Sequence, residues 1–239
     1  MGMPVTAHVR DPTFRPEGLD AAFAWLRQVD ELFSTYRPGS EVCRLDAGTL
    51  ALADADPLVR EVLAGCDALR DETGGAFDAR AGGRLDPSGL VKGWALDRAA
   101  ALVEAGSLCL DGGGDLVLRG GPWRVGIRHP LQHERLAAVL ELCEGAVATS
   151  ATYERGEHIL DPRTGRPPEG VLSVTVTGPV LATADAYATA AFAMGAAGPA
   201  WTAGLPAGFE AMTILQSGRV LSTPGFGGGP AVAAEPAAA

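Results

Sequence analysis

The sequence of 239 residues lacks the features that mark nucleic-acid-binding and membrane proteins. No run of Lys or Arg forms a basic stripe, and 19 basic against 29 acidic residues give a formal charge of −10. Because a protein binds a polyanion mainly through contacts with its phosphates, this charge argues against DNA or RNA as a partner. No apolar run approaches the roughly 18 residues of a membrane-spanning helix, so we expect no membrane segment.

Cysteine and targeting signals are also scarce. The four cysteines lie far apart, without a Cys-x-x-Cys pair or a histidine at metal-ligand spacing (Cys43, Cys66, Cys109 and Cys143). This pattern favours reduced thiols in the protein core. The amino end, MGMPVTAHVRDP, has neither a basic start followed by an apolar stretch nor a lipobox-like cysteine. We therefore expect a cytoplasmic protein, although a trimmed exported form would have the same sequence.

Composition and periodicity favour one α+β domain. Apolar residues make up 47% and charged residues 20% of the chain, which is ordinary for a soluble enzyme. Without a repeat or a linker, we expect one domain over 1–229 and a disordered Ala- and Pro-rich tail over 230–239. Helical spacing or alternation predicts helices over 18–36, 57–75, 94–106 and 182–195, and strands within 4–10, 107–120, 122–129, 135–154, 171–180 and 209–225. Their irregular alternation favours α+β over a doubly wound sheet.

The segment ATADAYATAAFAMG, residues 182 to 195, reads as a buried helix that contains two polar residues. Asp185 and Thr189 are four apart, so they share one helix face about one turn apart. A buried carboxylate is costly unless something pairs with it. Either Asp185 caps the helix start and Thr189 bonds back to its own helix, or this face holds a ligand that needs two oxygens.

Two glycine-rich segments could approach a ligand closely. LDPSGLVKGWALD (85–97) is expected to be a loop that leads into a helix, and Lys92 supplies a point charge suited to a phosphate. The segment lacks the GxxxxGK[ST] pattern of a P-loop, and taken alone it is better explained by a tight turn. DGGGD (111–115) is explained by a bulge or by a crossing with another backbone.

His158 is the most useful histidine, because it lies between a strand-like run and the turn DPRTG. Loops at strand ends carry function more often than core positions do, although a single histidine is more often structural. Its neighbours Glu157 and Asp161 could orient the imidazole or raise its pKa, and the sequence leaves both possibilities open.

Six motifs in a fixed order resemble the ApbE family, the flavin transferases that move FMN from FAD onto a protein threonine or serine. The resemblance runs from Met1 to about Met194. It implies an α+β fold of mixed or antiparallel sheets flanked by helices, in two closely associated sub-domains with the FAD cleft between them. The motifs are YRPGSEV, TGGAFD, LDPSGLVKGWALD, LDGGGDLVLRG, ATSATYERGEHILDPRTG and the VTV…ADAYATAAFAMG segment.

The resemblance also implies roles for individual residues. Asp185, Thr189 and a main-chain oxygen of Gly89 would hold a magnesium ion, which requires hard oxygen ligands. His158 would be the catalytic base. Ala188 stands where some family members have a second acid, and its side chain cannot ligate. The residues implied for FAD contact are Met1, Tyr36, Ala76, Phe77, Asp78, Asp86, Lys92 and Leu160.

The implied activity is that of a magnesium-dependent FAD:protein FMN transferase, which cleaves FAD and attaches FMN through a phosphoester to a Thr or Ser of an acceptor flavoprotein. AMP is the leaving group. An FAD pyrophosphatase and a non-catalytic FAD-binding protein stay open as alternatives. One departure concerns the segment between GGAFD and LDPSG, which typical members have longer; here only residues 79–84 join the two motifs.

Overall fold

The computed structural model describes residues 3–132, 134–151 and 159–227. The longer helices are α1 (Asp20–Phe33), α3 (Pro57–Glu72), α4 (Ser88–Ala101) and α6 (Leu181–Ala193). The shorter helical elements are α2 (Glu41–Asp46), α7 (Gly198–Thr202), η1 (Pro16–Leu19), η2 (Leu52–Asp54) and η3 (Gly195–Ala197). The strands are β1 (Val5–Val9), β2 (Leu108–Gly112), β3 (Asp115–Arg119), β4 (Trp123–Arg128), β5 (Leu136–Leu142), β6 (Gly145–Ala151), β7 (Val171–Gly178), β8 (Glu210–Leu215) and β9 (Val220–Ser222).

The strands form two antiparallel sheets, which confirms the α+β prediction. Seven strands pair in the order β1-β2-β3-β6-β7-β8-β9, whereas β4 and β5 form a separate two-stranded sheet. The predicted edge strand over 4–10 is confirmed as β1, and the closing hairpin over 209–225 is confirmed as β8 and β9. The tail over 230–239 lies outside the described residues.

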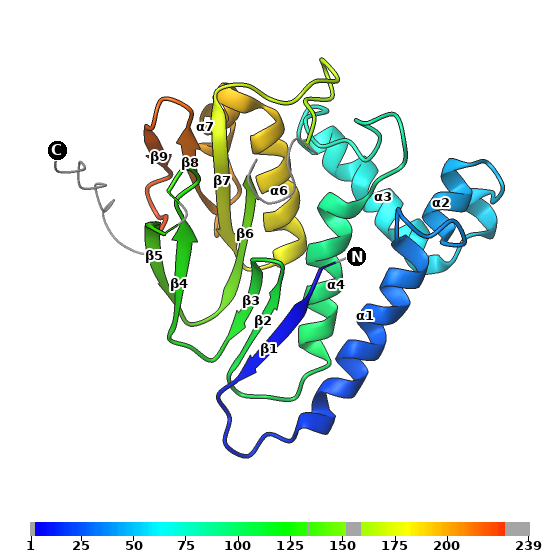
Figure 1. Cartoon of the computed structure of the whole chain (residues 1–239), viewed down its shortest axis with the longest axis horizontal. Coiled ribbons are helices and arrows are strands. Elements are labelled where there is room, and N and C mark those ends of the chain that lie inside the picture. The colour runs from blue at the N-terminus through cyan, green and yellow to red at the C-terminus, as the bar shows by residue number, and fades with distance from the viewer. Residues whose placement is uncertain (1–2, 133, 152–158, 228–239) are drawn as a thin grey trace.

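The large sheet is covered on both faces (Figure 1). Helices α4 and α6 lie on one face, and the β4–β5 sheet lies over part of the other. Side chains alternate accordingly along β2: Leu108 and Leu110 belong to the core shared with the helices, and Cys109 belongs to the core under β4 and β5. A single sheet therefore separates two hydrophobic cores.

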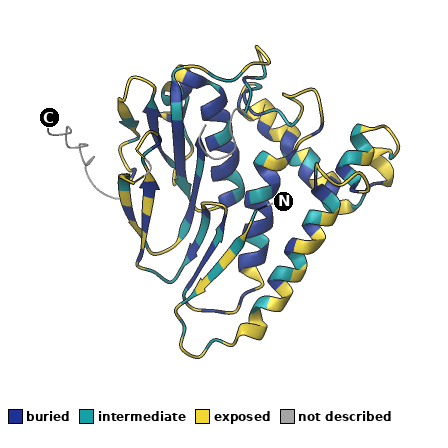
Figure 2. Ribbon diagram, viewed as in Figure 1, coloured by how far each residue is buried: buried dark blue, intermediate teal, exposed yellow. Residues whose placement is uncertain are grey.

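Helix α6 is central to the fold, because ten of its 13 residues are buried. Figure 2 shows it dark blue over most of its length, unlike α1, which alternates buried and exposed residues. The prediction of a buried helix over 182–195 is confirmed. A helix that is apolar all round requires neighbours on every side, here the sheet on one side and α4 on another.

The predicted start of a helix at Trp94 is wrong, because α4 begins at Ser88. The glycines of this segment serve helix packing instead of a loop. A Cβ on Gly93 would lie 2.6 Å from the carbonyl oxygen of Leu181, so the backbones of α4 and α6 meet at this point. Tertiary packing thus stabilises the first two turns of α4, whose two glycines, Gly89 and Gly93, argue against a helix locally.

The expectation that all four cysteines lie in the core is only partly correct. Cys66 and Cys109 are buried, but Cys43 is half-buried and Cys143 is exposed; all four are free thiols.

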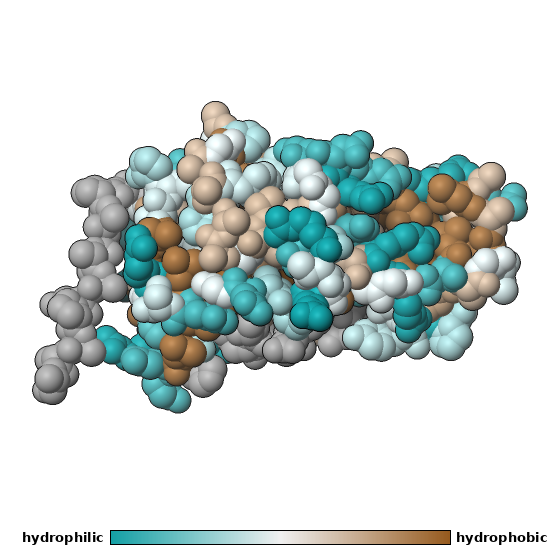
Figure 3. All heavy atoms as spheres, turned by 90° about the horizontal axis from the view of Figure 1, so that it is seen from above, coloured by the Kyte–Doolittle hydropathy of each residue, from teal (hydrophilic) through white to brown (hydrophobic). Residues whose placement is uncertain are grey.

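Hydrophobic residues gather on the surface at the end of the molecule that carries α2 (brown, right in Figure 3), where Leu52 is exposed. None of the described helices is both long and apolar enough to span a membrane.

Candidate active site

A pocket of about 420 Å³ lies against α4 and α6. Loops and strand ends from other parts of the chain complete its lining. Its lining contains every predicted site residue that the structure describes: Tyr36, Ala76, Phe77, Asp78, Asp86, Gly89, Lys92, Leu160, Asp185 and Thr189. The other two predicted residues, Met1 and His158, lie outside the described residues. Segments far apart in the sequence therefore meet around one cavity.

The TGGAFD segment forms one wall of the pocket through a turn after α3. The Thr73 hydroxyl donates to the carbonyl of Leu69 at 2.7 Å and accepts from the backbone N–H of Phe77 at 2.9 Å. Gly74 and Gly75 follow with φ of 61° and 84°, which side chains other than glycine rarely adopt. The chain reverses there, which turns residues 76–78 into the cavity.

The loop that carries Tyr36 is closed by Ser40. The Ser40 hydroxyl donates to the carbonyl of Ser34 at 2.7 Å and accepts from the backbone N–H of Cys43 at 3.1 Å, so Ser40 caps α2. Tyr36 projects from this loop and is 87% exposed. Its ring stands at the pocket with its faces accessible.

Asp185 and Thr189 share one face of α6 as predicted, and Asp185 is only 3% exposed. Oδ1 of Asp185 lies 3.5 Å from Nζ of Lys92, whereas Oδ2 has no hydrogen-bond partner among residues 3–132, 134–151 and 159–227. Burial raises the pKa of Asp185, and the positive charge of Lys92 acts in the opposite direction. Thr189 Oγ1 lies 3.5 Å from Oγ of Ser150.

The helix-capping alternative for Asp185 is wrong, because another carboxylate caps α6. The backbone N–H groups of Leu181 and Ala182 donate to Oδ1 and Oδ2 of Asp97, at 3.1 and 2.8 Å. Asp97 belongs to α4, so one helix caps its neighbour. Burial raises the pKa of Asp97, although both hydrogen bonds lower it.

Lys92 is held between two carboxylates, one of which sequence reasoning missed. Its Nζ forms an ion pair with Oδ2 of Asp115 besides its contact with Asp185. Asp115 is 1% exposed, and its Oδ1 accepts from the backbone N–H of Thr149 at 3.0 Å. The signal available in the sequence was the acid directly after the glycines of DGGGD. Gly113 and Gly114 form a two-residue turn with φ of 65° and 94°, which starts β3 at Asp115.

The donor atoms on this face of α6 fit a magnesium ion. Oδ2 of Asp185 is a buried oxygen without a hydrogen bond from the described chain, the Thr189 hydroxyl lies one turn further, and Gly89 faces Thr189. In the part of the chain that the structure describes, no group of three Asp, Glu, His or Cys side chains is placed to hold a metal ion. One carboxylate with neutral oxygens suits magnesium, which retains waters or takes substrate phosphate oxygens as ligands.

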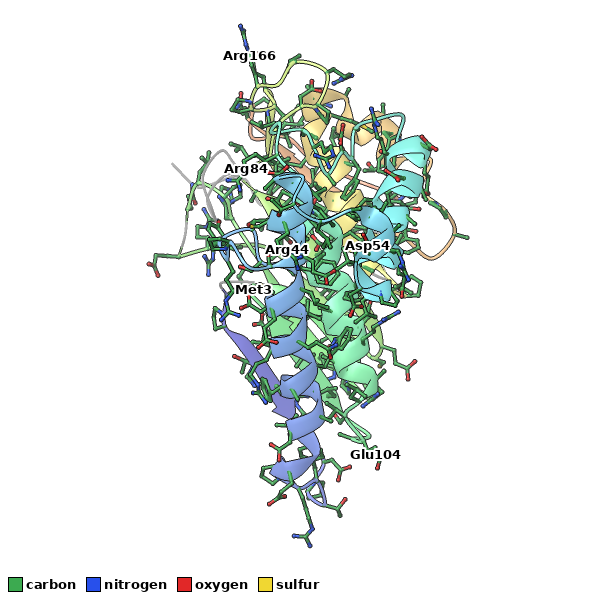
Figure 4. The ribbon with its side chains drawn as sticks, turned by 90° about the vertical axis from the view of Figure 1, so that its right-hand side faces the viewer. Met3, Arg44, Asp54, Arg84, Glu104 and Arg166 are labelled. Atoms are coloured by element: carbon green, nitrogen blue, oxygen red, sulfur yellow. The ribbon has the colours of Figure 1, made fainter. Side chains whose placement is uncertain are left out.

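The short segment 79–84 is tied to α2 by Asp46. Its carboxylate accepts from the backbone N–H of Leu85 at 2.7 Å and from Nε of Arg84 at 3.3 Å, and the hydrogen bond with Leu85 lowers the pKa of Asp46. Arg84 lines the pocket together with Met3, and both lie on the same side of the molecule (left in Figure 4). Neither residue carries a sequence signal that would have identified it.

Asp161, in the turn after His158, is engaged elsewhere. The guanidinium of Arg163 donates to both carboxylate oxygens of Asp161 at 2.9 and 3.0 Å. This hydrogen bonding lowers the pKa of Asp161. Of the two acids considered as partners of His158, Asp161 therefore has a local cationic partner, and Glu157 lies outside the described residues.

Comparison with protein families finds one match over most of the chain. The sequence profile of the ApbE family matches residues 1–83 and 79–213. The two matched stretches meet at the short segment between GGAFD and LDPSG.

Curated relatives match about half of the chain. An FAD:protein FMN transferase of Rhodobacter capsulatus is 36% identical over 154 residues, which are 57% of this chain and 29% of that protein. An FAD:protein FMN transferase of Vibrio cholerae is 34% identical over 129 residues, which are 46% of this chain and 39% of that protein. The match thus spans well under half the length of these relatives.

Solved structures share the fold over nearly the whole chain. The ApbE protein of Thermotoga maritima superposes with a TM-score of 0.83 at 24% identity, covering 94% of this chain and 95% of that chain. The flavin transferase ApbE of Vibrio cholerae superposes with a TM-score of 0.81 at 23% identity, covering 95% of each chain.

Proposed function

Since the chain belongs to the ApbE family, we propose that it is a magnesium-dependent FAD:protein FMN transferase. It would cleave FAD, attach FMN through a phosphoester to a Thr or Ser of an acceptor flavoprotein, and release AMP. One observation carries the proposal: all ten described residues that the motifs imply line a single pocket. The curated relatives that match about half of the chain are named for this activity.

The pocket offers different chemistry to the flavin ring and to the pyrophosphate of FAD. Tyr36 and Phe77 supply aromatic surface suited to a flat ring, and Tyr36 is exposed enough to stack on one. Ser88 and Gly89 form the first turn of α4, where backbone N–H groups and the helix dipole favour a phosphate. We assign the flavin to the aromatic part and the pyrophosphate to the start of α4, in the cleft between the two sub-domains that the family is expected to have.

Asp185, Thr189 and a main-chain oxygen of Gly89 would hold the magnesium ion. When bound, the ion would neutralise charge on the phosphoryl oxygens and orient the pyrophosphate for in-line attack. Asp185 is the main anionic ligand in this assignment, because its Oδ2 is buried and free of hydrogen bonds from the described residues. Thr189 contributes a neutral oxygen.

Asp115 is a positioning residue in this proposal. It compensates part of the charge of Lys92, which also lies beside Asp185. With Asp115 in place, the carboxylate of Asp185 keeps a larger share of its negative charge for a cation. The backbone N–H of Thr149 fixes the second oxygen of Asp115, so the lysine is held in one position.

We assign the general base to His158. An imidazole with a pKa near neutrality is suited to accept the proton of an attacking hydroxyl. The described residues beside it, Ile159 and Leu160, line or adjoin the pocket. A cytoplasmic location remains a prediction from the sequence and forms part of the proposal.

The decisive experiment incubates the purified protein with FAD and magnesium, with and without a candidate acceptor flavoprotein. We expect AMP release together with an acceptor whose mass increases by one FMN phosphoester. AMP with free FMN and an unmodified acceptor would identify a pyrophosphatase. FAD binding without AMP would identify a binding protein, and either result contradicts the proposal.

A further inference from the structure

A second hollow lies on the opposite side of the sheet from α4 and α6. This groove, of about 390 Å³, contains all six residues of β4. Its floor is the uncovered end of the large sheet, to which His8, Asp111 and Leu116 contribute. We call it the β4 groove. The chemistry proposed above uses none of these residues.

The β4 groove follows an open strand edge. β4 pairs with β5 along one side, and no strand of the described chain pairs with its other side. An unpaired edge offers backbone N–H and C=O groups to an extended peptide, which can add as a further strand. Six residues at a rise of about 3.3 Å span about 20 Å, enough for about six paired residues of an extended peptide.

The β4 groove adjoins the active-site pocket at one end. Thr149 lines both cavities, and the turn between β2 and β3 contributes Gly113 to the pocket and Gly114 to the groove. β4 begins beside the end of β3, where Nε1 of Trp123 donates to the carbonyl of Arg119, and it then runs back toward the level of this turn (Figure 1). A peptide in the groove would therefore reach the wall that borders the bound phosphates.

The positive charge along the open edge of β4 favours an acidic partner. Arg124 and Arg128 are exposed on alternate positions of β4, and Arg10 lies over the ring of Trp123 at 3.7 Å. Asp111 is the single acid among the described residues that line the groove, in a chain whose net charge is −10. Like charges oppose pairing of this edge with the same edge of a second copy. They favour a strand with acidic side chains.

We propose that the β4 groove docks the acceptor flavoprotein, through an extended acidic segment that pairs with β4 and delivers the Thr or Ser to the pocket. This inference rests on the proposed function, which supplies the acceptor. Two observations carry it: the open edge that ends at the pocket, and the arginines along that edge.

The test uses the whole protein and two fluorescein-labelled peptides of about eight residues with one central threonine, one alternating Glu and Val and one alternating Lys and Val. Fluorescence anisotropy should show that the acidic peptide binds at least about 10-fold more tightly than the basic one. The double variant Arg124→Glu/Arg128→Glu should lose that preference. The matched control Arg27→Glu/Arg60→Glu makes the same charge change at exposed positions on α1 and α3. This control variant should keep the preference for the acidic peptide.

A third peptide tests strand pairing separately from charge. The acidic peptide with N-methyl groups on alternate residues cannot donate those hydrogen bonds, and we expect its affinity to fall about 10-fold. Equal binding of the acidic and basic peptides, equal loss in both double variants, or unchanged binding of the methylated peptide would each overturn the proposal. So would a dimer of the original protein that Arg124→Glu/Arg128→Glu dissociates, because the edge would then join copies of this chain.

An FAD titration of the original protein separates this inference from the proposed function. FAD binding without peptide discrimination would reject the groove and leave the transferase assignment standing. Peptide discrimination without FAD binding would reject the transferase assignment, and with it the identity of the docked partner as a flavin acceptor.

Discussion

Two carboxylates lie between α4 and α6, Asp185 buried and Asp97 half-buried, and their surroundings differ. Asp97, near the start of α6, accepts hydrogen bonds from the backbone N–H groups of Leu181 and Ala182. Asp185, one turn into α6, faces Lys92 with one oxygen and has no hydrogen bond to the other from the described chain. Burial raises the pKa of both.

The difference separates a structural acid from a functional one. Because the backbone of α6 satisfies Asp97, removing that side chain should cost mainly stability. The environment of Asp185 leaves part of a buried charge uncompensated, which a protein retains at a cost in stability. Because Asp185 lines the pocket, we attribute this cost in stability to a function of the site. Substitutions at the two sites should therefore affect different properties.

The largest expected effect is that of Asp185→Ala. It should abolish AMP release from FAD while the protein stays folded, because the main anionic ligand of the metal is lost. Thr189→Val is the matched variant with a smaller loss, since a neutral oxygen contributes less to a hard cation. Turnover by Asp185→Ala at the original rate would refute the metal assignment.

The next effect is that of His158→Ala, which tests the base instead of the metal. FAD and magnesium affinity should stay near their original values, while turnover falls by roughly 10²- to 10⁴-fold, the usual range for loss of a general base. Parallel loss of FAD affinity and thermal stability would show a structural histidine. Both quantities are measured on one preparation, by FAD titration and AMP release.

Asp115→Asn should weaken magnesium binding by about 10-fold, equivalent to about 1.4 kcal/mol. Asparagine keeps an oxygen for the N–H of Thr149 but removes the carboxylate charge that competes with Asp185 for Lys92. The double variant Lys92→Met/Asp115→Asn removes the competing cation, so magnesium affinity should recover. Calorimetric titration of magnesium measures both variants, and equal affinity in the single variant would exclude a positioning role for Asp115.

Asp97→Ala should have the smallest effect on activity. Its main effect should be on stability, with the free energy of unfolding lowered by about 1–2 kcal/mol. Because burial raises the pKa of Asp97, its contribution to stability is greatest below about pH 4 and declines as pH rises through the folded pKa. The difference in unfolding free energy between the original protein and the variant should therefore shrink from pH 4 to pH 7. Urea unfolding at several pH values measures it; a difference that grows with pH would contradict this assignment.

Local sequence determined the helix that carries the site. The apolar run around Asp185 and Thr189 predicts a helix buried on all sides, and the spacing of four places both oxygens on one face. The alternating strands follow in the same way, because alternation depends on neighbouring residues. These predictions are confirmed because periodicity and turn chemistry act over a few residues.

Tertiary structure alone decided which groups meet. Gly89 and Gly93 suggest a loop, yet the close approach of α6 makes them part of a helix, since packing outweighs a propensity cost of about 1 kcal/mol per glycine. The pairing of Lys92 with Asp115, and the cap of α6 by Asp97, join residues from different elements. No local pattern encodes such contacts, because burial of distant elements against one another determines which charges come within reach.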